Sequence, residues 1–349
     1  MRPTPESILA AGLNVRDKLA NGRLADLRPM PSSIVDDTPL RVVHRYVPTV
    51  PNVDSRPILL VPPLAAPALA FDLRRGASLV EHLVASGRPT YLVDYGPIPV
   101  ADTTLGLEFW VDDVLPHAIR TVAKDAGDDV ALVGWCLGGI FSMLATAADP
   151  GLPVRSVTAI ASPFDISAVP LVAPLRPLAT IAGGTVSTAL RLLNGVPAPL
   201  TRWAFRLSSV DKYVMRPITI LSKLDDRDFL EQVEAVDNLM HNMHAYPGRV
   251  FGQLYHRMFR ANDLAGGYLD LDGRRIELAD IEVPAMLIGG TDDVLAPIAA
   301  VRRGADLLTG SPHVRFEAAP GGHLGVLTGR RARTTTWTHL DAFLSSAAA

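Results

Sequence analysis

One stretch, residues 130–148, constrains the fold of this chain more than any other. Residues 130–133 are all apolar and predict a buried strand. They lead into Gly-Trp-Cys-Leu-Gly (134–138), and the apolar, small-residue run that follows predicts a helix. A turn this tight leaves no room for side chains at the two flanking glycines and strains the backbone of the residue between them. The sequence therefore predicts that the thiol of Cys136 is held at a helix N-terminus, where a thiolate is favoured.

The pattern Gly-x-Cys-x-Gly has the form of the α/β-hydrolase nucleophile elbow, with cysteine in place of serine. The alternative is a chance match in which Cys136 is a small buried hydrophobe. Triads on this fold follow the chain order nucleophile, acid, histidine. Here Asp292 and Asp293 follow an apolar strand, and His323 follows the next strand within a Gly-Gly turn. We predict His323 as the base. We predict Asp293 as the acid, because the glycine before it and the proline after it match the turn that usually carries the acid on this fold. Asp292 remains the alternative.

The rest of the chain alternates apolar strands with helical segments. This rhythm predicts an α/β-hydrolase fold, with a mostly parallel central sheet and helices on both faces. The rhythm disappears over residues 163–278, where we predict an inserted, mainly helical cap. The predicted domains are an N-terminal helical extension (1–40), a core (41–162 and 279–349) and this cap. The predicted strands are 41–48, 57–61, 90–94, 130–133, 154–160, 283–290 and 314–318, and the predicted helices are 4–21, 76–86, 109–124, 139–148, 228–243, 247–260 and 334–344.

Composition excludes several classes of function. A net charge of −3 argues against nucleic acid as the main partner. The single cysteine excludes an internal disulfide and a multi-cysteine zinc site, and it fits a reducing cytosol, so we expect a cytoplasmic protein. The N-terminal residues lack the apolar core of a signal peptide, and no uninterrupted apolar run is long enough for a transmembrane segment. Nothing in the sequence indicates a metal or nucleotide cofactor.

The elbow also predicts where an oxyanion would bind. The backbone N–H of Leu137 follows the nucleophile and is the first expected donor. The second donor usually comes from the loop after an early strand, here residues 62–67. Its two leading prolines have no N–H, so Leu64 or Ala65 is the expected donor. The alternative is an ordinary strand-to-helix loop.

Cysteine in place of serine bears on the reaction. A cysteine acyl-enzyme is a thioester, close in free energy to an acyl-coenzyme A donor, whereas a serine acyl-enzyme is a lower-energy oxygen ester. The cysteine intermediate therefore keeps the acyl group activated for transfer to a hydroxyl. This favours acyl transfer over simple ester hydrolysis.

Besides the elbow, several motifs along the chain point to one known family, at 71–73, 91–96, 162–165, 210–214, 224–229, 273–278, 281–284 and 320–325. In these motifs the sequence resembles the catalytic subunit of polyhydroxyalkanoate synthases and, by length, the short class III type. The resemblance implies that Cys136, Asp293 and His323 form a triad. It also implies that a 3-hydroxyacyl-coenzyme A substrate charges the cysteine, that a hydroxyl takes the acyl group, and that no cofactor is needed. A second synthase subunit or a homodimer is the implied partner, with association to a granule or lipid surface.

Three positions depart from that family. Leu137 stands where a glutamine is common, Val294 where a histidine often follows the acid, and Ala65-Ala66 replace a more polar stretch. Two alternatives therefore stay open. One is a cysteine-dependent lipase, thioesterase or acyltransferase of long-chain acyl substrates on the same fold. The other is an inactive granule-surface or scaffold protein.

Overall fold

The computed structural model describes residues 4–48, 50–51, 56–98, 104–170, 195–196 and 216–346. Much of the first half of the predicted cap, including the motif at 210–214, lies outside the described residues.

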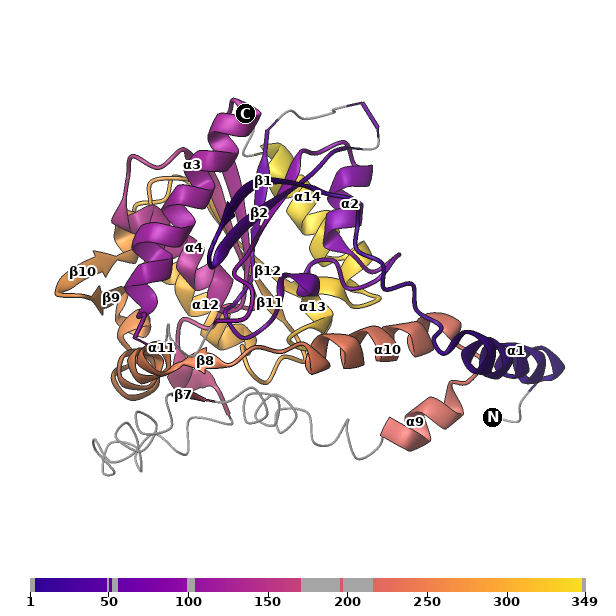
Figure 1. Cartoon of the computed structure of the whole chain (residues 1–349). Helices are drawn as coiled ribbons and strands as arrows, with labels where there is room; N and C mark the ends of the chain where they lie inside the picture. The colour runs from indigo at the N-terminus through magenta and orange to yellow at the C-terminus, as the bar shows by residue number, and fades with distance from the viewer. Residues whose placement is uncertain are drawn as a thin grey trace.

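The described part of the chain is organised around an eight-stranded sheet with the order β1-β2-β4-β3-β5-β6-β11-β12 (Figure 1). The pairs β1–β2 and β2–β4 are antiparallel, and every neighbouring pair from β4 to β12 is parallel. The predicted mostly parallel sheet is thus confirmed. Its strands are β1 (Ser33–Thr38), β2 (Arg41–Tyr46), β3 (Ile58–Val61), β4 (Thr90–Asp94), β5 (Val130–Trp135), β6 (Val154–Ile160), β11 (Ala285–Gly290) and β12 (Val314–Ala319).

The central strands are continuous apolar runs because helices cover both of their faces. All residues of β3, β5 and β11 are buried. The edge strand β12 is mostly half-buried. Strand β1 also lies at an edge and is largely exposed, and its polar sequence, Ser-Ile-Val-Asp-Asp-Thr, gives no buried apolar run. The range 1–40, predicted as a helical extension, therefore also contains a strand of the sheet.

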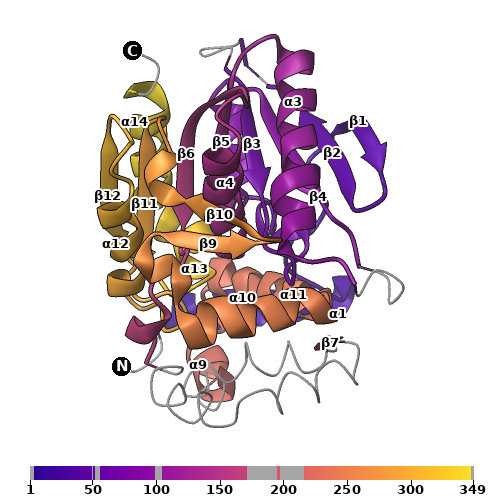
Figure 2. The ribbon, with the colours of Figure 1, turned by 90° about the vertical axis from the view of Figure 1, so that its left-hand side faces the viewer.

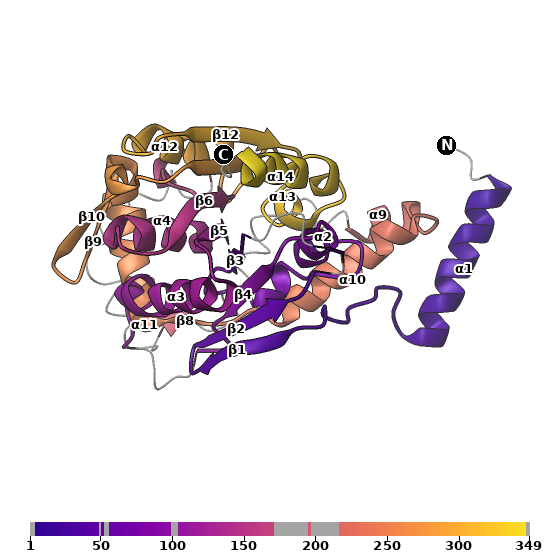
Figure 3. The same cartoon turned by 90° about the horizontal axis from the view of Figure 1, so that it is seen from above.

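Helices α3, α4 and α12 cover one face of the sheet, and α2 and α14 cover the other (Figure 3). His82 Nε2 and Asp341 Oδ2, 2.8 Å apart, join α2 to α14. The π-helical stretch 109–114 runs directly into α3, and a second π-helical stretch, 254–261, follows α11. The helices are α1 (Pro5–Asn21), α2 (Leu79–Ala85), α3 (Leu115–Ala126), α4 (Leu137–Ala148), α9 (Arg216–Ser222), α10 (Arg227–His241), α11 (Gly248–Gln253), α12 (Ile298–Leu307), α13 (Gly325–Thr328) and α14 (Thr336–Ser346).

Helices α10 and α11 lie across one end of the sheet (Figure 2). The backbone N–H of His244, just after α10, donates to Ala65 O at 2.8 Å, in the loop that follows β3. This contact identifies the covered end as the one where the parallel strands finish. The chain between β6 and β11 also forms two small antiparallel pairs of strands. They are β7 (Gly195–Val196) with β8 (Tyr246–Pro247), and β9 (Tyr268–Leu271) with β10 (Arg274–Glu277).

Helix α1 stands apart from the sheet and lies beside α10 (Figures 1 and 3). The Thr4 side chain caps its start by accepting from the Ser7 N–H, and Gly22 ends it in the left-handed conformation. A cavity of about 790 Å³ separates α1 from α9 and α10. Apolar side chains of α1 are exposed, among them Leu19 at 80%, which lines this cavity. In the described chain no helix has the length and apolarity needed to cross a bilayer.

Candidate active site

Cys136 lies at the junction of β5 and α4, as the sequence predicts. Its backbone angles are φ 55° and ψ −123°, an unusual conformation for a residue with a side chain. A Cβ at Gly134 would collide with the backbone of the first turn of α4, and one at Gly138 would collide with the carbonyls of Val61 and Pro62. Both glycines are therefore required by the close approach of neighbouring backbone.

Two hydrogen bonds hold the strained residue in place. The Cys136 N–H donates to Ile160 O at 2.8 Å, and Ser162 Oγ donates to Cys136 O at 2.7 Å. Both partners come from the end of β6 and the residues after it, the strand next to β5 in the sheet. Ser162 has no role in the sequence interpretation beyond the family motif, because only the adjacency of β5 and β6 brings its hydroxyl to the elbow.

His323 follows β12 and contacts an acid that follows β11. The distance from His323 Nδ1 to Asp293 Oδ2 is 2.8 Å. The other oxygen, Asp293 Oδ1, accepts from the N–H groups of Leu295 and Ala296, each at 2.9 Å. The Asp293 side chain is fully buried, whereas that of Asp292 is 55% exposed. Of the two candidate acids, Asp293 is the one that contacts the imidazole.

The imidazole of His323 interacts with the cysteine as well as with that carboxylate. Burial by itself would lower the pKa of His323. The negative charges of Cys136, as a thiolate, and of Asp293, with hydrogen bonds to both, outweigh burial and raise this pKa to about 10. Around neutral pH the histidine is therefore held protonated beside the sulfur. An imidazolium next to a thiolate is the arrangement that makes a cysteine nucleophilic.

Trp135 fixes the backbone of the histidine loop. Its indole Nε1 donates to His323 O at 3.0 Å, and the indole and imidazole centroids are 5.2 Å apart. The residue before the nucleophile thus holds the histidine, although the two are 188 positions apart. The sequence contained no signal for this contact, since Trp135 is simply the last apolar residue of a buried strand.

The loop predicted to supply an oxyanion donor lies beside the elbow. Gly138 packs against the carbonyls of Val61 and Pro62, and Leu64 and Ala65 directly after them are almost completely buried. Helix α4 begins at Leu137, so its first N–H groups belong to the elbow itself. The three predicted donor residues therefore lie on two backbone segments in contact with each other.

Tyr246 was not singled out from the sequence. Burial, and then the negative charge of Cys136, raise the pKa of its phenol. This electrostatic effect places Tyr246 near the sulfur. The contact between His244 and Ala65 brings the same segment onto the loop after β3.

Within the described residues, no group of three or more His, Cys, Asp and Glu side chains could hold a metal ion.

Comparison with known proteins identifies relatives over most of the chain. No protein-family model matches the sequence. Poly(3-hydroxyalkanoate) polymerase subunit PhaC of Allochromatium vinosum is 26% identical over 322 residues, which cover 91% of this chain and 89% of that protein. The PhaC subunit of Thiocystis violacea is 23% identical, with 91% and 88% covered. That of Cupriavidus necator is 26% identical, with 91% of this chain but 56% of the longer relative covered.

Solved structures share the architecture at lower sequence identity. A putative non-heme bromoperoxidase from Mycobacterium tuberculosis H37Rv aligns with a TM-score of 0.55 at 14% identity, covering 88% of this chain and 96% of that one. Mouse alpha/beta hydrolase domain-containing protein 10 aligns with a TM-score of 0.51 at 15% identity, covering 90% and 99%. These likenesses establish the fold, which is that of the α/β-hydrolases, as the sequence predicts.

Proposed function

We propose that this chain, a homologue of the poly(3-hydroxyalkanoate) polymerase subunits PhaC, is an acyltransferase. Its donor is a 3-hydroxyacyl-coenzyme A, its intermediate is a thioester of Cys136, and its acceptor is a hydroxyl. The observation that supports the proposal is the 2.8 Å contact of His323 with the buried carboxylate of Asp293, together with the electrostatic effect of Cys136 on the same imidazole. No cofactor is required, because the coenzyme A thioester is itself the activated donor.

The first half-reaction charges the cysteine. The Cys136 thiolate attacks the thioester carbonyl, and a C–S bond forms to the enzyme. Collapse of the tetrahedral intermediate breaks the bond to coenzyme A, whose thiolate takes the proton from the His323 imidazolium. Asp293 accepts the Nδ1–H throughout, which fixes the tautomer and presents Nε2 to the sulfur.

The second half-reaction transfers the acyl group. The now neutral imidazole of His323 takes the proton of a 3-hydroxyl, from another unit or from a growing chain, as its oxygen attacks the Cys136 thioester. The new C–O bond replaces the C–S bond, and the thiolate and imidazolium return. The N–H of Leu137 and that of Leu64 or Ala65 would stabilise the oxyanion in both halves.

We further propose that residues 163–278 form a cap over the cysteine, and that the protein acts in the cytoplasm with a second synthase subunit or as a homodimer at a granule or lipid surface. The contact of His244 with the loop after β3 supports the cap. The single cysteine supports the location. Exposed apolar side chains on α1 and α9, such as Leu19 and Leu221, support a partner or surface.

Release of coenzyme A from 3-hydroxybutyryl-coenzyme A tests the reaction. The wild type, alone or with an added partner subunit, should release it, and mass spectrometry should find the acyl group on Cys136. Butyryl-coenzyme A, which lacks the 3-hydroxyl, should acylate the enzyme without forming oligomers.

Three results would contradict the proposal: no release by the wild type, undiminished release by Cys136→Ala, or free acid as the sole product. The last would favour a thioesterase on the same fold.

A further inference from the structure

Arg74 is a charged residue in the interior, with only 2% of its side chain exposed. It lies in the loop between the short 3₁₀ turn 68–70 and α2. All five of its N–H donors have acceptors. Nε donates to Gln232 Oε1 at 3.2 Å, Nη1 to Arg75 O and Glu231 Oε2 at 3.1 Å each, and Nη2 to Asp228 O at 3.2 Å and Asp228 Oδ1 at 2.5 Å. A planar guanidinium satisfied at every donor is a built site rather than a chance surface pair.

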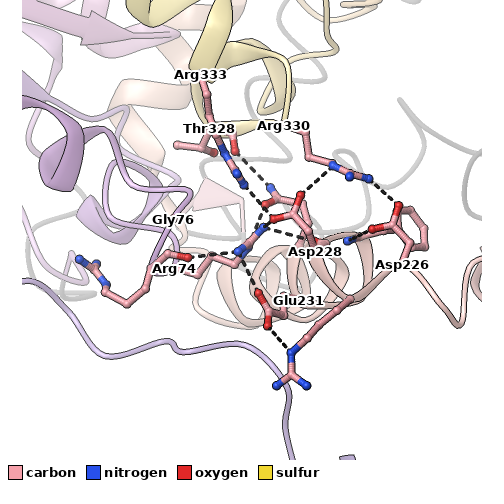
Figure 4. Close-up of polar contacts among 12 residues, drawn as sticks. Arg74, Gly76, Asp226, Asp228, Glu231, Thr328, Arg330 and Arg333 are labelled. Atoms are coloured by element: carbon pink, nitrogen blue, oxygen red, sulfur yellow. Dashed lines mark hydrogen bonds and ion pairs between the residues drawn. The ribbon is translucent and has the colours of Figure 1, made fainter. Parts of the chain in front are cut away.

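All but one of these acceptors belong to the first two turns of α10, more than 150 positions away in the chain. Asp228 is the centre of the arrangement (Figure 4). Its carboxylate also accepts from Arg333 Nη2 at 3.0 Å and pairs with Arg330 Nε at 2.7 Å. Burial opposes its charge, yet the hydrogen bonds from Arg74 and Arg333 lower the pKa of Asp228. The start of α10 is thus tied to two different parts of the core.

The second of these parts is the segment that follows His323. Helix α13 begins two residues after the histidine. The Val326 N–H donates to Gly322 O at 2.9 Å, a hydrogen bond that spans His323. Gln232, whose Oε1 accepts from Arg74, donates through Nε2 to Thr328 O at 3.4 Å, at the last residue of α13. Arg330 and Arg333 follow immediately. The chain from His323 to Arg333 is therefore held at one end by Trp135 and at the other by α10.

We infer that Arg74 is a positioning residue that acts through Asp228 and Gln232: it holds the start of α10 against the segment after His323 and thereby fixes where the imidazole lies. The inference rests on the proposed function, because it concerns the pairing of that imidazole with Cys136. Separating α10 from the core would leave a buried guanidinium without partners, which a protein interior strongly disfavours. The start of α10 is consequently an anchored part of the cap.

The pH dependence of Cys136 alkylation tests the inference, since the chain has one cysteine and labelling has no background. Iodoacetamide reacts with the thiolate, and the pH profile of the wild-type rate is the reference. In Arg74→Met alkylation at neutral pH should be slower, so that the profile moves to higher pH. The kcat for coenzyme A release should fall about 10- to 100-fold with little change in KM, because a misplaced base impairs the chemical step.

A second variant and a control separate positioning from folding. Gln232→Met keeps the ion pairs of Arg74 but cuts the link to Thr328, and it should shift the alkylation profile in the same direction even if Arg74→Met fails to fold. Arg227→Gln removes an ion pair within α10, to Glu231, and one that ties α10 to Asp17 of α1, and it should leave the profile unchanged.

Two results overturn the inference, and they are distinguishable. A wild-type profile in every folded variant, with only the melting temperature lowered, would make the network purely structural while leaving the proposed function intact. An ordinary thiol profile in the wild type itself, with no coenzyme A release, would remove the proposed function and the positioning role together.

Discussion

Cys136 is strained, and its neighbours hold the strain in place. A residue with a side chain in such a backbone region costs about 1–3 kcal/mol relative to relaxed geometry. The bonds from Cys136 N to Ile160 O and from Ser162 Oγ to Cys136 O offset part of this cost. The remaining requirement is empty space on both sides of the nucleophile, which only glycine provides.

Gly138→Ala should therefore destabilise the protein by about 1–3 kcal/mol and abolish Cys136 alkylation at neutral pH, because the added Cβ meets the backbone of Val61 and Pro62. Gly252→Ala, in α11, is the matched control. A Cβ there meets nothing within 4 Å, and the change should be stabilising by roughly 0.5–1 kcal/mol. Urea unfolding and alkylation rates measure both effects, and a Gly138→Ala protein as stable and reactive as the wild type would refute the argument.

Asp293→Asn should lower the rate of coenzyme A release by about 10²–10⁴-fold while the protein stays folded. An amide oxygen can still accept from Leu295 and Ala296, but the amide NH₂ would then face His323 Nδ1 and favour the wrong tautomer. Asp292→Asn should stay within about twofold of the wild type, since that side chain is exposed. Equal losses in the two variants would show that the acid is misassigned.

The sequence was sufficient to identify Cys136 and His323 as candidates and to favour Asp293 as the acid, but Asp292 stayed open as the alternative. Asp292 and Asp293 are adjacent in one turn and differ only in which side chain points inward. The direction of each side chain depends on how the loop after β11 folds over Asp293. The roles of Trp135 and Ser162 were also out of reach, because each depends on a neighbouring strand that sequence periodicity does not specify.

At the scale of elements, prediction succeeded where apolar runs were continuous. Strands β3, β5 and β11 are buried on both faces and stand out from any helix or loop. Strand β1 was missed because its edge position leaves none of its residues fully buried, so it has no apolar run. The attachment of α10 through Arg74 could not be predicted, since ion pairing between residues 154 positions apart leaves no periodic signal.

Glu234 attaches the segment after α1 to α10, and this attachment should depend on pH. Its carboxylate accepts from the N–H groups of Leu24 and Ala25, at 2.7 and 2.9 Å, and pairs with Lys18. Burial opposes the charge, but these bonds lower the pKa of Glu234 below its model-compound value of 4.5. A lowered carboxyl pKa stabilises the folded state fully above 4.5 and progressively less as pH falls below it.

The difference in unfolding free energy between wild type and Glu234→Gln should accordingly be roughly 1–3 kcal/mol at pH 6 and shrink as the pH falls below 4.5. Urea unfolding of both proteins across this range measures it, and the subtraction removes carboxyl groups common to both. A difference that is constant with pH would show that the bonds do not depend on the carboxylate charge.

Across the whole molecule, the segment after His323 and the N-terminal helix are attached to different residues of α10. Asp228 and Gln232 contact Arg74 and the segment after His323, whereas α1 contacts Glu234 through Lys18 and Arg227 through Asp17. In the described residues α1 also reaches the turn before α10, where Asn14 Nδ2 donates to Leu224 O at 2.8 Å. Stability and catalysis should therefore respond separately to changes at α1.

Deletion of residues 1–22 tests this separation. The loss of these polar contacts and of the apolar cover over α9 and α10 should lower the unfolding free energy by a few kcal/mol, on the order of the contacts removed. The pH profile of Cys136 alkylation should nevertheless match that of the full chain, because Trp135, Asp293 and the Arg74 contacts remain. Circular dichroism on heating measures the first effect and iodoacetamide labelling the second. If the shortened protein instead showed an ordinary thiol profile while still folded, α1 would have to act on the histidine through α10, and the two sets of contacts on that helix would be coupled.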